Sequence, residues 1–148
     1  MLLIADLEEY AESVKARVPA IKKTVTLSDE AQLAKVLTDH KASDNILLVA
    51  LYADHDKDRD NLYEWNNITS FLVLEKIDYS TGLPAMGESF KRTQAAAAAI
   101  VKLMLEDYEE HSCGLMGKLI IESLNIGPRR ALTQCQGYEI TFNLITEL

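Results

Sequence analysis

ESFKRTQAAAAAIVKLMLEDYEEH (88–111) is the strongest helix signal in the chain. The stretch is rich in Ala, Leu, Met, Lys and Glu and contains neither Gly nor Pro, so its helix propensity is high throughout. The run of alanines at 95–99 is small and flat, which allows a sheet or a second helix to approach closely. Before this helix, the Gly and Pro residues of STGLPAMG (80–87) predict a loop.

Two stretches on the N-terminal side of this loop predict a long β-hairpin. ILLVALYAD (46–54) is a continuous apolar run with the length of a strand that is covered on both faces. LYEWNNITSFLVLEKIDY (62–79) carries aromatic and β-branched residues through most of its length and is typical of a return strand, with a break near Asn66 and Asn67.

Two further strands are predicted after the long helix. They are GKLIIESLNIG (117–127) and GYEITFNLITEL (137–148), with PRRALTQCQ (128–136) as their connection. The last stretch alternates, and its apolar and aromatic side chains share one side: Tyr138, Ile140, Phe142 and Leu144. Because no tail follows to cover this strand, we expect it to be an edge strand that is open to pairing with another subunit.

The first 40 residues predict two helices around a short strand. Apolar residues at three- and four-residue steps from Leu3 to Val18 predict an amphipathic helix that ends at Pro19. KKTVTL (22–27) predicts the strand, and SDEAQLAKVLTDH (28–40) predicts the second helix with Ser28 as its cap.

The order of these elements predicts the fold class. Strands in pairs, separated by one long helix, indicate a single α+β domain that covers residues 1–148. We expect a mixed or antiparallel β-sheet with a long hairpin, and helices packed mainly on one face.

The composition limits the kinds of molecule that the chain is expected to bind. Fifteen basic and 23 acidic side chains give a net charge of -8, and a surface of this sign repels phosphate backbones. The exception is a ring or tube through which DNA slides without sticking. No apolar run approaches the roughly 20 residues that a membrane-spanning helix needs. The two cysteines form no disulfide framework, so an intracellular origin with reduced thiols is expected.

DHDKDRDN (54–61) carries an aspartate at every second position: Asp54, Asp56, Asp58 and Asp60. A calcium loop of the EF-hand type that starts at Asp56 places Asn61 where a Gly is required and the neutral Asn67 where a carboxylate must close the site. Its flanks are predicted strands, whereas an EF-hand has helices there. No metal ligand is therefore assigned, and a weak divalent-cation site stays open as an alternative.

The alternation in this segment favours a different interpretation. In an extended segment successive side chains point to opposite sides, so the four aspartates share one face and His55, Lys57 and Arg59 share the other. We expect a protruding hairpin tip that meets a neighbouring subunit, lines a passage for DNA, or is simply solvated. Arg129 and Arg130, in the predicted connection 128–136, are available for a carboxylate of a partner or are simply solvated in a turn.

Little in the sequence points to catalysis. The three histidines, at 40, 55 and 111, are far apart in sequence and lie among charged neighbours, so we expect them to be solvated. Cys113 and Cys135 lack the spacing of a redox pair, and buried or incidental thiols are expected. The chain contains no G-x-S-x-G, H-E-x-x-H or phosphate-binding lysine motif. We therefore predict no catalytic residue and no cofactor, and the chain is not expected to be an enzyme.

Two stretches resemble a known family. LPAMGESFKRTQAAAAAIVKLMLEDYEE (83–110) and NIGPRRALTQCQGYEITFNLITEL (125–148) are similar to tail terminator or tail-completion proteins of tailed bacteriophages, prophages and tail-like particles. The second stretch has an I-x-P … G-[WY]-x-[IVL]-x-F-x-[IVL] ending, carried by Ile126, Pro128, Gly137, Tyr138, Ile140, Phe142 and Leu144. The resemblance covers the second half of the chain closely and the first half only as an order of elements.

This resemblance implies a structural virion protein without catalysis. It implies an α+β subunit that forms a homohexameric ring at the head-proximal end of the tail tube, in a virion assembled in the bacterial cytoplasm. Its partners are then other copies of itself, the tail tube protein, the neck or connector proteins, and DNA that passes through a negative lumen. A head-closure or neck adaptor protein is the alternative within the virion. A small bacterial α+β binding module with a weak cation loop is the alternative outside it.

Overall fold

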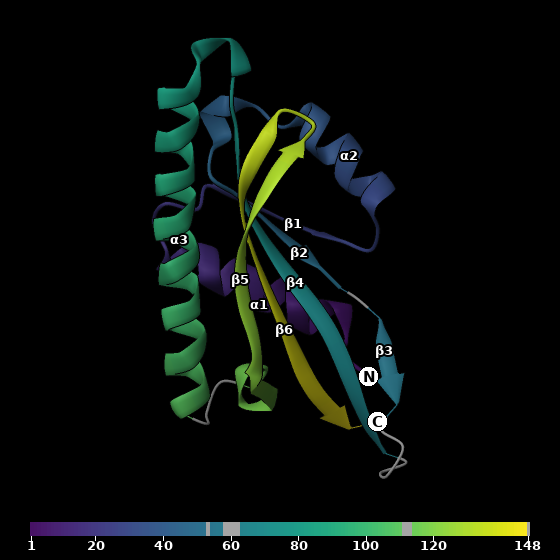
Figure 1. The fold of residues 1–148 in the computed structure, drawn as a ribbon. Helices are drawn as coiled ribbons and strands as arrows, with labels where there is room; N and C mark the ends of the chain where they lie inside the picture. The colour runs from purple at the N-terminus through teal and green to yellow at the C-terminus, as the bar shows by residue number, and fades with distance from the viewer. Residues whose placement is uncertain (53, 58–62, 111–113, 148) are drawn as a thin grey trace.

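The computed structural model describes residues 1–52, 54–57, 63–110 and 114–147, which form one six-stranded mixed sheet with helices against it (Figure 1). The helices and strands run as follows: α1 Ile4–Arg17, β1 Lys23–Leu27, α2 Glu30–Asp39, β2 Leu47–Leu51, β3 His55–Lys57, β4 Glu64–Lys76, α3 Leu83–Glu109, β5 Leu119–Leu132 and β6 Cys135–Glu147. Short 3-10 helices lie at Ala42–Asp44 (η1), Tyr79–Thr81 (η2) and Met116–Lys118 (η3). The α+β class predicted from the sequence is confirmed.

The strand order is β1-β2-β4-β6-β5, and β3 also pairs with β4. β1 is parallel to β2, while the other described pairs are antiparallel. The predicted long hairpin is present as β2 and β4. The predicted break near Asn66 and Asn67 is wrong, because β4 pairs with β6 without interruption from Glu64 to Lys76.

The prediction that the terminal strand is an edge is also wrong. β6 lies between β4 and β5, so its neighbours are strands on both sides. The edge strand beside β6 is β5, which extends through most of the segment predicted as a connection. Only Thr133 and Gln134 form the β5–β6 turn, and both have a positive φ, of 48° and 62°. A two-residue turn of this hand matches the twist of the strands that it joins.

Two hydrophobic cores lie on opposite faces of the sheet. The larger one lies beneath α1 and α3 and contains Ile140, Phe142 and Leu144 of β6, all fully buried. The smaller one places Leu33 and Leu37 of α2 against β2 and β4. Helices therefore pack mainly on one face, as expected, with α2 alone on the other. Core on both faces explains why β2 is apolar without alternation.

The beginnings of two helices differ from those predicted. α3 begins at Leu83, inside the predicted loop, because Gly82 (φ 87°) turns the chain and Pro84 is compatible with the first turn of a helix. α2 is capped by Asp29, whose carboxylate accepts a hydrogen bond from the backbone of Gln32 at 2.8 Å. Ser28 instead bonds the side chain of Gln32, so the cap lies one residue later than predicted.

One glycine of the sequence motif is required by packing. A Cβ atom at Gly137 would lie 1.9 Å from the carbonyl oxygen of Val73 in β4. No side chain fits in this space, so β6 can lie against β4 here only with a glycine.

Candidate functional site

The acidic segment lies at one end of the sheet. β3 pairs with residues 65–67 at the start of β4. Asp54 and Asp56 lie beside this end of β4, and both are exposed. His55 points the other way, and its Nδ1 lies 2.6 Å from Oδ1 of Asn67. The extended alternation expected for this segment is thus present at 54–56. Asp58 and Asp60 lie outside the described residues.

The paired arginines lie far from this segment, near the β5–β6 turn at the opposite end of the sheet (Figure 1). Asp56 is opposite Asn66 and Arg129 is opposite Gly137, which pairs with Leu74. The eight residue steps from position 66 to position 74 of β4 span roughly 25 Å at the usual strand rise. The chain therefore does not bring Asp54 or Asp56, the two described aspartates of this segment, close to Arg129 and Arg130.

The two arginines lie in β5 itself and not in a connection, so that expectation is corrected. Arg129 Nη1 lies 3.7 Å from a carboxylate oxygen of Glu139 in β6. The guanidinium of Arg130 lies 6.0 Å from the centre of the Phe90 ring of α3, within range of a cation–π contact. Phe90 in turn meets Tyr138 edge to face at 6.3 Å. Both arginines thus help to hold β5 within its own subunit.

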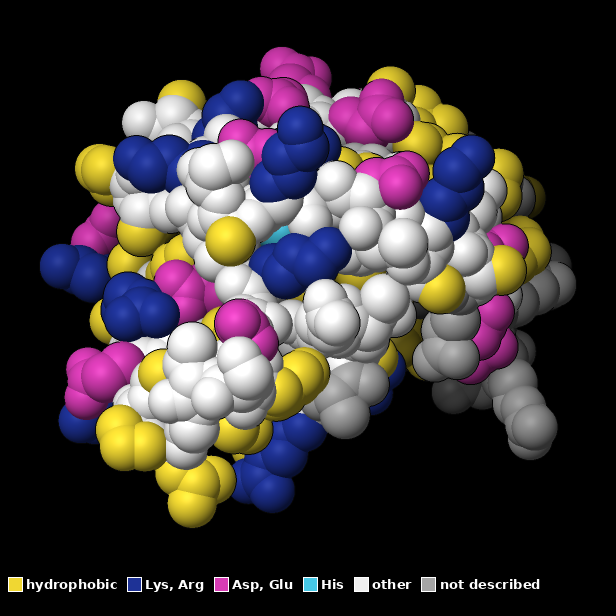
Figure 2. Space-filling view, turned by 90° about the horizontal axis from the view of Figure 1, so that it is seen from above, with side chains coloured by type: hydrophobic (Ala, Val, Ile, Leu, Met, Phe, Trp, Pro, Cys, Tyr) yellow, Lys and Arg dark blue, Asp and Glu magenta, His cyan; other side chains and the backbone are white. Residues whose placement is uncertain are grey.

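The charges at this end of the molecule are mixed. Seen from above, Lys and Arg side chains are interspersed with Asp and Glu side chains (Figure 2). The net charge of -8 is therefore not gathered into one acidic patch on this face.

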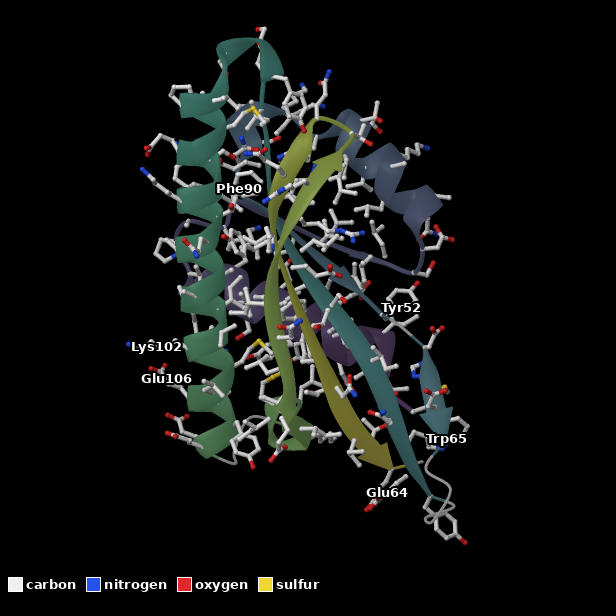
Figure 3. The ribbon with its side chains drawn as sticks, viewed as in Figure 1. Tyr52, Glu64, Trp65, Phe90, Lys102 and Glu106 are labelled. Carbon is white, nitrogen blue, oxygen red and sulfur yellow. The ribbon has the colours of Figure 1, made fainter. Side chains whose placement is uncertain are left out.

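A groove lies between α3 and the edge strand β5. Its volume is about 490 Å³, and its apolar wall contains Ala98, Val101, Leu105 and Ile126. Ile126 is 41% exposed although it is opposite the fully buried Ile140. Lys102 and Glu106 on the outer side of α3 form an ion pair of 3.8 Å beside the groove (Figure 3). An exposed apolar groove beside a strand edge is a candidate docking surface.

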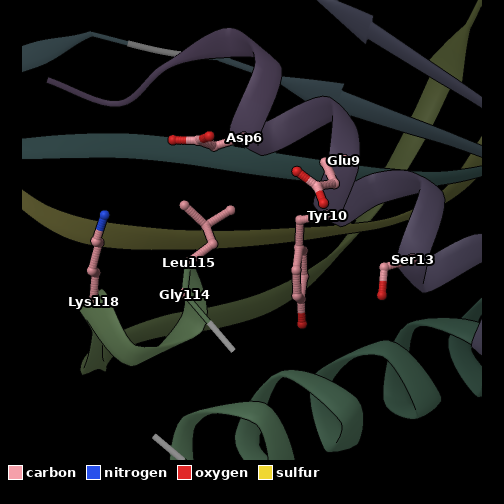
Figure 4. A pocket seen from close by; sticks show the side chains of 7 residues that line it. All are labelled: Asp6, Glu9, Tyr10, Ser13, Gly114, Leu115 and Lys118. Atoms are coloured by element: carbon pink, nitrogen blue, oxygen red, sulfur yellow. The ribbon is translucent and has the colours of Figure 1, made fainter. Parts of the chain in front are cut away.

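A cavity of about 460 Å³ lies between the start of α1 and η3 (Figure 4). Asp6 and Glu9 border it from α1, and Lys118 borders it from η3. The Tyr10 ring forms part of its wall, with the hydroxyl directed toward α3.

The Tyr10 hydroxyl belongs to a polar cluster that joins α1 to α3. It donates a hydrogen bond of 2.8 Å to Asp107, and Arg17 binds both oxygens of the same carboxylate at 2.8 and 2.7 Å. The hydrogen bonds from Arg17 hold the pKa of Asp107 below its usual range, against the effect of burial. Burial, together with the Asp107 carboxylate, raises the pKa of Tyr10 well above its usual value. A neutral Tyr10 and a charged Arg17 thus both donate to the Asp107 carboxylate, which suits a structural clamp.

A second polar cluster holds the end of α2. Lys76 of β4 donates from Nζ to three backbone oxygens, those of Leu37, Thr38 and His40, at 3.1, 2.9 and 2.8 Å. His40 itself is buried, contrary to the solvated position expected, and its Nε2 lies 2.8 Å from Oδ1 of Asn45. A cation at the C-terminus of a helix also complements the helix dipole.

The chain offers little for metal or thiol chemistry in the part that the structure describes. No three His, Cys, Asp or Glu side chains of residues 1–52, 54–57, 63–110 and 114–147 gather where they could hold a metal ion. Cys135 is buried, as expected, and burial raises the pKa of its thiol to about 11. Cys113 and His111 lie outside the described ranges. None of the described helices is long and apolar enough to cross a membrane.

A scan of the chain against protein-family models finds no match, and a search of curated proteins finds no similar sequence.

Proposed function

We propose that this chain is a structural subunit of a bacteriophage tail, and that copies of it form a ring that terminates the tail tube and joins it to the neck. In this role the chain acts through contacts with itself, with the tail tube protein and with neck proteins. It catalyses no reaction, and DNA is a partner only as it passes through the ring.

The observation that carries this proposal is the packing of the two stretches that resemble tail terminator proteins. They form α3 and the β5–β6 hairpin, which lie against each other. Gly137 fits against the backbone of Val73, and Tyr138 packs on Phe90 of α3. Ile140 and Phe142 fill the main core. The motif residues thus hold β6 to both α3 and β4, as expected if the resemblance reflects a shared fold.

The strand order excludes the terminal strand as the place where a neighbouring subunit extends the sheet. β6 is already paired on both sides, so a neighbour cannot extend the sheet at the terminal strand. The end strands of the described sheet are β1 and β5, and the short β3 pairs only with β4. A contact between β5 of one copy and β1 of the next would be head to tail, and such contacts close rings when the rotation between copies is right. Pro128 and two register shifts limit regular pairing along β5 to short segments.

Electron micrographs of particles assembled without this chain test the proposal. We expect tails of uncontrolled length, because nothing then stops the growth of the tube. Tails of normal length that fail to join heads would instead identify a neck adaptor.

The mass of the purified protein is a second test: if it stays monomeric both alone and with tail tube subunits, the ring is ruled out.

A further inference from the structure

One stripe along α3 is not covered by the rest of the subunit. Its residues follow steps of four and three, as in the seam of a coiled coil, and all but the half-buried Leu105 are exposed: Lys91, Ala95, Ala98, Lys102, Leu105 and Glu109. We call them the α3 stripe. The helix that carries it is 27 residues long, about 40 Å at the usual rise per residue.

The α3 stripe has ends of opposite charge and a mainly apolar middle. Ala95, Ala98 and Leu105 lie in this middle together with Lys102, which forms an ion pair with Glu106 of the same helix. Ala98 and Leu105 also line the groove beside β5. Lys91 lies toward the start of the helix with its side chain 73% exposed, and Glu109 ends the helix. The small alanines leave room for the axis of a second helix to come within about 8 Å.

The opposite charges at the two ends of the α3 stripe favour a second copy of α3 as the partner, in antiparallel orientation. When a second copy of α3 lies antiparallel on the first, with positions 98 and 102 opposite each other, Lys91 of each copy faces Glu109 of the other. Ala95 then faces Leu105. In a parallel pair in register, Lys91 would face Lys91 and Glu109 would face Glu109, and like charges at this spacing repel.

The exposed apolar residues at the start of α1 fit this surface poorly. Leu3 and Ile4, at the start of α1, are 58% and 44% exposed. Asp6 lies two residues after Ile4, so docking this segment in the groove would bring Asp6 toward Glu106 and Glu109. Like charges across a contact disfavour that occupant.

We propose that two copies of this chain pair through the α3 stripe in an antiparallel, two-fold arrangement. A two-fold axis repeats the Lys91–Glu109 contact, so the pair of chains has two such contacts. In the subunit Lys91 already binds Glu88 at 2.8 Å, so pairing places it between two carboxylates. The overlap from 91 to 109 is about 28 Å long, which places the contact among the smaller interfaces and predicts a concentration-dependent dimer. The contact does not close a ring, so it is independent of the proposed tail function.

Charge reversal tests the pairing, with mass read by sedimentation over the micromolar concentration range. Lys91→Glu and Glu109→Lys should each raise the dissociation constant of the dimer at least about tenfold, because both contacts become repulsive. The double variant should restore the dimer. An equal mixture of the two single variants should form a heterodimer, because each reversed position then faces an opposite charge.

Matched controls are Lys41→Glu and Glu8→Lys, which change the net charge equally at exposed positions outside α3. They should leave the dissociation constant within about twofold of that of the unchanged chain. Circular dichroism checks that every variant is folded. A monomer at all concentrations, or a dimer that Lys91→Glu weakens no more than Lys41→Glu, overturns the pairing. A ring mass that is insensitive to both reversals overturns the pairing and leaves the proposed function intact.

Discussion

Gly137 is the residue at which the β6 backbone comes closest to β4. We expect Gly137→Ala to lower the free energy of unfolding by about 2–3 kcal/mol, because the added Cβ meets the carbonyl oxygen of Val73 and the two strands must separate. Urea unfolding measures this loss. Gly127→Ala is the matched control, since nothing lies within 4 Å of a Cβ at that position of β5. Equal stability of the two variants would show that the strands separate at no cost.

Asp107 links stability to pH. Its pKa is depressed in the folded chain, so its ionised form contributes stability above its unfolded pKa of about 3.9, and this is lost as pH falls through the folded value. Asp107→Asn should lower the free energy of unfolding at pH 7 by about 1–3 kcal/mol, because it weakens hydrogen bonds to a charged group. The variant should also lose less stability than the unchanged chain below pH 4.

Unfolding in urea at a series of pH values measures both effects. Glu106→Gln is the control, because it removes an exposed carboxylate from the same helix. Its effect at pH 7 should stay within about 1 kcal/mol. If Asp107→Asn parallels the unchanged chain across the acid range, the clamp contributes no pH dependence.

Individual residues were the hardest features to predict. Charged neighbours in the sequence suggested a solvated His40, but Asn45 and Lys76 reach it from other elements. The role of Gly137 depends on Val73, more than 60 residues earlier in the chain. Alternation located the buried side of β6, because that pattern is local.

At the scale of elements, α2 depends on a lysine from β4. We expect Lys76→Met to speed amide hydrogen exchange in the last turn of α2 and to lower stability by about 1–2 kcal/mol, since three backbone carbonyls lose their donor. Lys41→Met, at an exposed position nearby, should change neither. Unchanged exchange in α2 after Lys76→Met would mean that water replaces the lysine.

The order of elements was predictable, but the order of strands in the sheet was not. Periodicity and breakers located α1, α3 and the β2–β4 hairpin, because these signals lie within each segment. The expectation that β6 is an edge strand was wrong because strand pairing is not local. β6 pairs with β4, although α3 and β5 lie between these two strands in the sequence. For the same reason the acidic segment and the arginines could be singled out, but their separation could not be foreseen.

At the scale of the whole molecule, the two cores should unfold together, because β2 and β4 contribute to both. We expect Leu37→Ala, in the smaller core, to lower the free energy of unfolding by about 2–5 kcal/mol. The fluorescence of Trp65, on β4 at the far end of the sheet, should shift to the same urea midpoint as circular dichroism. Leu83 is 80% exposed, so Leu83→Ala should shift the midpoint of neither probe. Separate midpoints for the two probes would show that the cores are independent.

The central place of β6 has a consequence for synthesis on the ribosome. β4 and β5 are joined only through β6, which follows them in the chain. A nascent chain that has reached β5 still exposes the side of β4 that β6 will cover, so the main core closes late. Contacts between residues distant in sequence also slow folding. The core beneath α1 and α3 therefore stays open beside β4 until β6 has left the ribosome.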